Sequence, residues 1–299
     1  MSPIHHAATG MSSPSSAIIP VALVFVSFIY ALGWRRMPKV PARAIRGWRA
    51  ASFLFGIFLV WGALGSPLVV YDHDLLTVHM IQHLLLMTFA PALILLGEPL
   101  LVLSYGLPRF TQILLVELSR RLLAQTFTRT LFQPAFCWSV SALTLLIWHM
   151  PAVFTFGMHS EAWHSFEQAS FLGAGFLFWW PVVHPWPCTS TGPQWSTLLY
   201  LFLATLPCDI LSGFLVFSDR VAYPLYFSTP RHFGFSALQD QQCAAALMWT
   251  CVTIVYLVPT AILSTRLLSP RTFHRGDLVQ SELRGTASAA PDPQTVEAA

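Results

Sequence analysis

The stretch HMIQHLLLMTFAPALILLGEP, residues 79–99, is apolar over most of its length, yet it starts with two histidines and a glutamine. A run of about 20 apolar residues is long enough to cross the hydrocarbon core of a bilayer. His79 and His83 are four residues apart, so they project from the same face of a helix. Because lipid cannot solvate imidazole, that face must point into a bundle of helices. The stretch therefore predicts a membrane-spanning helix with polar residues gathered near one end.

The whole chain has the composition of a multi-pass membrane protein. Hydrophobic residues make up 55% of the chain and charged residues only 10%, whereas soluble domains carry about 25% charged residues. The mean hydropathy is +0.60, and the charges cluster between long apolar runs. We therefore expect an all-α integral membrane protein, a class whose natural surroundings are the lipid bilayer.

Seven apolar runs predict about seven transmembrane helices, within a membrane domain of residues 18–265. The N-terminal segment, residues 1–17, has no Lys or Arg and no evident processing site follows the first run, so we interpret that run as a retained span. Residues 98–133 mix apolar and basic residues, which favours a basic amphipathic helix at the cytoplasmic surface. The polar tail, residues 266–299, is predicted to be disordered. The seven expected spans are Ile18–Leu32, Ala50–Ser66, Leu75–Gly97, Pro134–Phe156, Trp163–Val183, Trp195–Phe217 and Gln241–Leu263.

The basic residues predict the orientation of these spans. Of the sixteen Lys and Arg residues, all but Arg220 and Arg231 lie between the first and second spans, between the third and fourth, or after the seventh. Cytoplasmic loops carry such an excess. We therefore expect the N-terminus outside and the C-terminus in the cytoplasm, as in a multi-pass protein of the bacterial inner membrane. Topology thus explains the basic balance, and no nucleic-acid partner is predicted.

In this orientation, ionisable and amide groups of four spans lie at one depth near the outer face. Four histidines from three helices, His79, His83, His149 and His164, predict a metal site, because intramembrane ionisable residues are usually functional. Imidazole suits copper, zinc, iron and nickel, and thioether sulfur adds a preference for Cu(I). Glu167 and Asp240 would either orient a ligating imidazole or cap a helix. The possible auxiliary residues are Met80, Glu167, Gln168, Asp240, Gln241 and Cys243.

Four motifs, in this order and spacing, resemble the CtaG family of multi-span, caa3-type cytochrome c oxidase assembly factors: HMIQHLLLMTFAPALILLGEPL, WHMPAVF, WHSFEQASFLGAGFLFWWPVV and LQDQQCAAALMW. The resemblance covers about Asp72–Ile262, nearly the whole membrane part. It implies a role in supplying copper to the oxidase, and it supports the four histidines with Glu167, Asp240 and Gln241 near them. The chain departs from the family pattern at Gln168, where a second histidine is expected, and at Ala244 and Ala245, where glycines often follow the DQQ motif.

We therefore expect a cytochrome c oxidase assembly factor that holds copper near the outer face and passes it to a haem-copper oxidase subunit or to another copper chaperone. Because a ligating imidazole must be unprotonated, binding should weaken as the pH falls through about 6 to 7. Two alternatives remain open: a haem-binding redox protein in which His79 or His83 pairs with His149 or His164, and a proton-coupled transporter. No nucleophile with a base and an orienting group is evident, so no enzyme activity is predicted.

Overall fold

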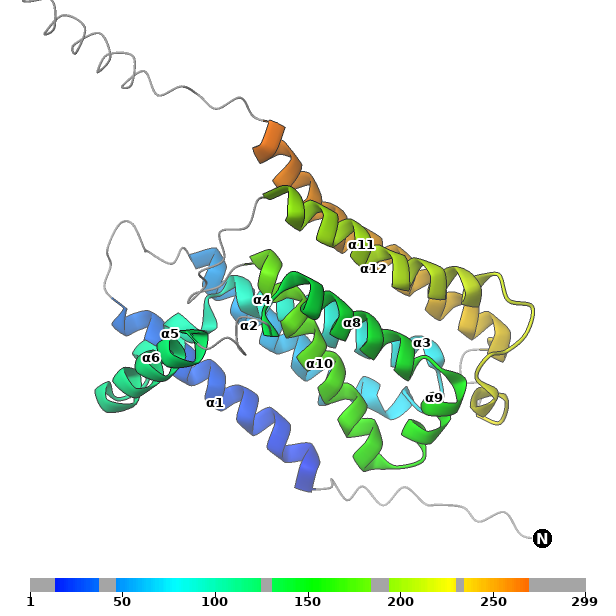
Figure 1. Ribbon diagram of the computed structural model, residues 1–299. Helices are drawn as coiled ribbons and strands as arrows, with labels where there is room; N and C mark the ends of the chain where they lie inside the picture. Colours follow the sequence, from blue (N-terminus) through cyan, green and yellow to red (C-terminus); the bar gives the residue numbers. More distant parts are fainter. Residues whose placement is uncertain (1–13, 38–46, 125–130, 184–193, 230–233, 269–299) are drawn as a thin grey trace, which may run out of the picture.

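A computed structural model describes residues 14–37, 47–124, 131–183, 194–229 and 234–268, and within these ranges every regular element is a helix (Figure 1). The predicted all-α class is confirmed. Most of the expected N-terminal segment and nearly all of the expected tail lie outside the described residues. The elements are α1 (Pro14–Arg36), α2 (Gly47–Leu64), η1 (Pro67–Tyr71), α3 (Leu76–Leu84), η2 (Leu85–Phe89), α4 (Ala90–Leu96), α5 (Pro99–Gly106), α6 (Arg109–Ala124), α8 (Pro134–Trp148), α9 (Pro151–Met158), α10 (Glu161–Val183), α11 (Gln194–Val216), η3 (Pro224–Phe227) and α12 (Ala237–Leu268).

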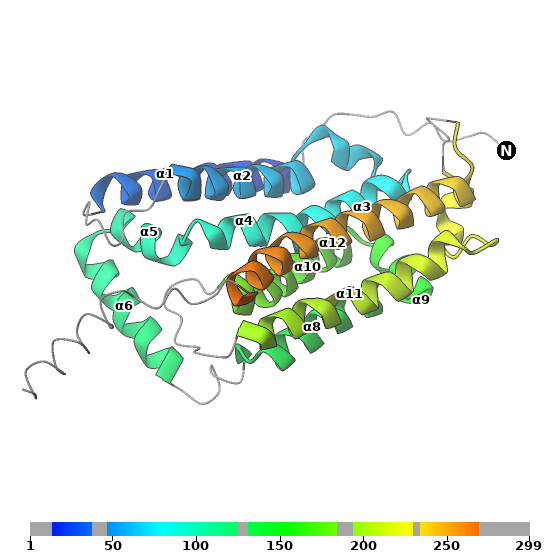
Figure 2. The same cartoon turned by 90° about the horizontal axis from the view of Figure 1, so that it is seen from above.

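The segment α3–η2–α4 is the centre of the bundle. It packs against α2, α10 and α12. In its most apolar stretch 61% of the residues are buried, compared with 11% in the most apolar stretch of α1. A helix that is apolar on all sides is expected to be enclosed by other helices. Figures 1 and 2 show α11 and α12 side by side, with α2 on the other side of the central segment. The quoted stretch thus forms the core on which the remaining helices pack.

The central segment contains one turn of π-helix, η2, which ends two residues before Pro91. Proline has no N–H to donate and its ring crowds the preceding turn, so the ladder of hydrogen bonds changes there. The Ala90 N–H accordingly bonds to Leu85 O, five residues back. Helix α10 approaches this turn closely at Gly175, where an added Cβ would lie 2.5 Å from Met87 O. The distortion and the glycine together bring α10 against the central segment.

The expected fourth span, Pro134–Phe156, is broken in the structure. Helix α8 ends at Trp148, α9 starts at Pro151, and the two helices are bent by 76°. The residue before a proline is biased away from the helical region, and Met150 is extended at ψ 127°. The prediction of one continuous helix is therefore wrong at this end, and His149 lies at the break.

The described residues contain five helices that are long and apolar enough to cross a membrane, or six if the bent pair is one span. The remaining expected span, Trp163–Val183, is fully helical within α10. Its first turns carry His164, Glu167 and Gln168, which lower its hydropathy. The chain is thus a multi-pass helical membrane protein, while the number seven stays a prediction.

Basic side chains gather at one end of the bundle, which we call the basic end. Arg35 and Arg36 end α1, Arg49 lies in the first turn of α2, and Arg109 and Arg121 belong to α6. Arg49 forms a 2.7 Å ion pair with Glu98, at the corner between α4 and α5. The predicted amphipathic stretch, residues 98–133, is divided: α5 packs against α1 with Val102 buried, and α6 follows it. Figure 2 shows α5 and α6 at this end and α9 at the other.

Candidate metal centre

We call the end of the bundle opposite the basic end the histidine end. There the first turn of α3 is capped by a side chain from another helix. Asp240, from α12, accepts hydrogen bonds from Leu76 N at 2.7 Å and from Thr77 N at 3.1 Å. The first N–H groups of a helix have no partner within it, and a carboxylate there is also favoured by the helix dipole. Asp240 therefore fixes the start of α3, and with it the height and rotation of His79.

His79 and His83 lie on one face of α3, with ring centroids 4.2 Å apart. Both are buried, and both point at the fully buried carboxylate of Glu167 on α10. Glu167 Oε1 is 3.6 Å from His79 Nε2 and 3.5 Å from His83 Nε2. Two imidazoles of one helix thus converge on one carboxylate oxygen of the next.

His164 joins this group from one turn earlier on α10. Its ring lies 5.5 Å from the ring of His79, and His79, His164 and Glu167 each offer a ligand atom within 4.8 Å of the other two. The amide nitrogen of Gln168 lies 3.4 Å from His164 Nε2. An amide N–H can only donate, so Gln168 orients the His164 ring and takes no part as a metal ligand in this arrangement.

His149 completes the group from the break between α8 and α9. Its Nδ1 is 2.8 Å from Leu145 O, and its ring lies 6.2 Å from that of His83. A carbonyl can only accept, so Nδ1 carries the proton and Nε2 keeps a lone pair. This is the tautomer that a metal ligand needs. We call His79, His83, His149, His164 and Glu167 the core cluster.

The core cluster has buried polar atoms without hydrogen-bond partners. Both ring nitrogens of His79 and of His83, Nε2 of His149 and both carboxylate oxygens of Glu167 are in this state. Burying such atoms unpaired costs free energy, and most proteins avoid it. A metal ion would bind several of these lone pairs at once and would balance a Glu167 carboxylate. The residues therefore fit a metal ion.

A small cavity extends from the core cluster into the bundle. Its volume is about 40 Å³, which is room for a few waters or an ion. His83 and His149 line it together with four sulfur-bearing residues, and thioether sulfur prefers Cu(I). The sulfur-bearing residues are Met80, Met87, Cys208 and Met248.

Three predicted auxiliary residues lie apart from the core cluster. Asp240 caps α3, as described above. Gln241 accepts from Ala222 N at 2.7 Å and donates to Leu215 O and Arg220 O, so it ties the start of α12 to the end of α11. Cys243 is exposed on α12. Of the auxiliary residues, Glu167, Gln168 and Met80 are the ones that reach the cluster or its cavity.

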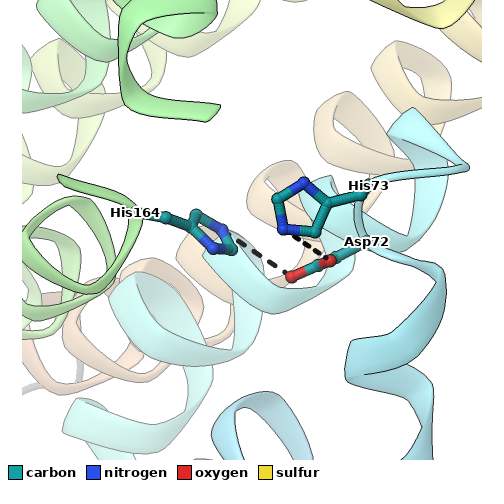
Figure 3. Close-up of side chains that lie close together, drawn as sticks. All are labelled: Asp72, His73 and His164. Atoms are coloured by element: carbon teal, nitrogen blue, oxygen red, sulfur yellow. Dashed lines mark ion pairs between the residues drawn. The ribbon is translucent and has the colours of Figure 1, made fainter. Parts of the chain in front are cut away.

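Asp72 and His73 were not predicted from the sequence, and both lie beside His164 (Figure 3). They belong to the short segment between η1 and α3, residues 72–75. Two tyrosines near η3 also support the site: Tyr223 donates to His149 O at 3.0 Å, and Tyr226 donates to Asp72 O at 3.1 Å. The available signal was a run of ionisable residues directly before a span that starts with histidines.

Comparison with known proteins gives a family. Two uncharacterised proteins, Mb0105 of Mycobacterium bovis and MT0111 of Mycobacterium tuberculosis, are each 24% identical to the chain over 263 residues. The match takes in 84% of this chain and 38% of each relative, so the chain spans well under half the length of these proteins. No solved structure matches the chain. The sequence model of the family of cytochrome c oxidase caa3 assembly factors matches residues 28–269 of the chain, and the chain therefore belongs to that family.

Proposed function

We propose that this protein binds copper in the core cluster and supplies it to a haem-copper oxidase during assembly of the enzyme. The observation that carries the proposal is the convergence of four buried imidazoles and one buried carboxylate. Within this group the ring nitrogens of His79 and His83, Nε2 of His149 and both oxygens of Glu167 lack hydrogen-bond partners. Family membership supports the assembly role. The thioethers of Met80, Met87 and Met248 beside the cavity support copper over zinc, because sulfur ligands are soft.

The proposal includes an orientation in the bacterial inner membrane. The basic end faces the cytoplasm, as the excess of Arg and Lys favours, and the histidine end faces outward. Copper then enters and leaves the protein at the outer face. Its direct partner is an oxidase subunit or a copper chaperone with an exposed copper site.

Metal analysis of purified protein tests the proposal. Wild type, His79→Ala and His83→Ala are produced in copper-supplemented cells, together with His159→Ala, which removes an exposed histidine of the histidine end. Wild type and His159→Ala should hold copper in stoichiometric amount. The other two variants should hold much less, because each loses a core imidazole. Thermal melting of each variant in detergent shows that the fold is retained.

Equal copper content in all four proteins would overturn the core cluster as the copper site. A Soret band with stoichiometric haem in the wild type would support a haem-binding redox protein instead.

A further inference from the structure

An aspartate and two histidines meet at the histidine end, beside the core cluster. Asp72 Oδ1 lies 3.5 Å from His73 Nε2, and Asp72 Oδ2 lies 3.7 Å from His164 Nε2. The three residues each offer a ligand atom within 4.8 Å of the other two. Figure 3 shows the carboxylate between the two rings. We call Asp72, His73 and His164 the rim triad.

Asp72 is held in place by hydrogen bonds, and one of its carboxylate oxygens still lacks a hydrogen-bond partner. Its side chain is 1% exposed, Tyr226 donates to its backbone carbonyl at 3.1 Å, and Gln82 Nε2 donates to Oδ2 at 3.4 Å. Oδ1 accepts no hydrogen bond. A bound cation would stabilise a buried carboxylate oxygen that has no hydrogen-bond partner. The unpaired oxygen therefore indicates a ligand site and not only a structural contact.

The rim triad connects the surface with the interior. The side chain of His73 is 55% exposed, whereas that of His164 is 9% exposed. The ring of His164 lies 5.2 Å from that of His73 on one side and 5.5 Å from that of His79 on the other. His164 thus belongs both to the rim triad and to the group that it forms with His79 and Glu167.

We propose that the rim triad is an entry site for Cu(II), from which the ion moves to the core cluster by ligand exchange around His164. Nitrogen and carboxylate oxygen ligands suit Cu(II). During the exchange the bonds to Asp72 and His73 break and bonds to His79 and Glu167 form. The bond to His164 is kept, and the ion stays Cu(II) during this exchange, because only imidazole and carboxylate ligands take part in it and the methionines of the cavity do not. The proposal rests on the proposed function, because the core cluster is the acceptor of the ion.

Copper uptake by the purified full-length protein tests the entry site. Cu(II) alone is added to protein freed of metal with a chelator, and bound copper is followed in time and at equilibrium. His73→Ala should take up copper about tenfold more slowly than wild type, because an exposed ligand and a buried carboxylate no longer capture the ion together. Its final copper content should equal that of wild type. Asp72→Asn, which preserves the shape of the side chain, should also slow uptake. The matched control is His159→Ala, whose uptake should be unchanged.

His79→Ala separates this proposal from the proposed function. It should bind Cu(II) at the rim triad and release it quickly to an added chelator, whereas wild type should release it slowly. Uptake by His73→Ala and Asp72→Asn at the wild-type rate would overturn the entry site alone. Slow release by His79→Ala, with wild-type copper content, would overturn the core cluster as the inner acceptor.

Discussion

Glu167 is the residue on which the two histidines of α3 converge. Its carboxylate lies 3.5 and 3.6 Å from their Nε2 atoms and accepts no hydrogen bond. An anionic oxygen at this distance favours a cation placed among the three side chains, either by direct ligation or by orienting an imidazole. The role of the residue therefore depends on its charge and not only on its shape.

Glu167→Gln should weaken copper binding by about 10- to 100-fold, because the amide preserves the shape but removes the negative charge. The affinity is measured by competition with a copper chelator of known strength. Glu161→Gln serves as the control, because Glu161 is an exposed residue in the first turn of the same helix. An unchanged affinity in Glu167→Gln would show that the carboxylate contributes no charge to binding.

At the scale of elements, the position of α10 against the central segment decides where His164 and Glu167 lie. The two approach each other tightly at Gly175, two turns from Glu167, where a Cβ would lie 2.5 Å from Met87 O and 2.7 Å from Pro91 Cγ. Backbone and a proline ring cannot move aside as a flexible side chain can. A larger residue at this position must push the two helices apart.

Gly175→Ala should therefore lower the stability of the protein by about 1–3 kcal/mol. Thermal melting in detergent measures the loss. Gly173→Ala is the control on the same helix, because its Cβ would meet nothing within 4 Å and alanine favours a helix over glycine. If both variants melt at the wild-type temperature, the close contact of α10 with η2 is not a determinant of the fold.

The sequence predicted the depth of the core cluster because charge asymmetry and apolar runs together assign heights to residues. It correctly paired His79 and His83 on one face, since helical periodicity does so without tertiary information. The function of Asp240 was less accessible, because its partners Leu76 and Thr77 lie more than 160 residues away and on another helix. Asp72 and His73 were missed because they lie between two spans, where apolar periodicity assigns no facing direction.

For the whole molecule, the structure separates two kinds of chemistry along the bundle. Arg35, Arg36 and Arg49 lie at one end of the helices, and the core cluster and rim triad lie at the other. Among the described basic residues, Arg220 is the exception, because it lies in the turn after α11, at the histidine end. If the basic end faces the cytoplasm, the proposed copper loading would take place at the outer face. The orientation of the bundle would therefore decide from which side the proposed site receives its metal and to which side it delivers it.

Thiol labelling of spheroplasts tests this orientation. His159→Cys adds a thiol at the histidine end and Arg109→Cys adds one at the start of α6, at the basic end. A membrane-impermeant maleimide should label His159→Cys in intact spheroplasts and Arg109→Cys only after lysis, because an excess of basic residues favours the cytoplasmic side for that end of the bundle. Wild type provides the background labelling of the native cysteines. The reverse pattern would mean that the core cluster faces the cytoplasm, and copper would then have to be supplied from inside the cell.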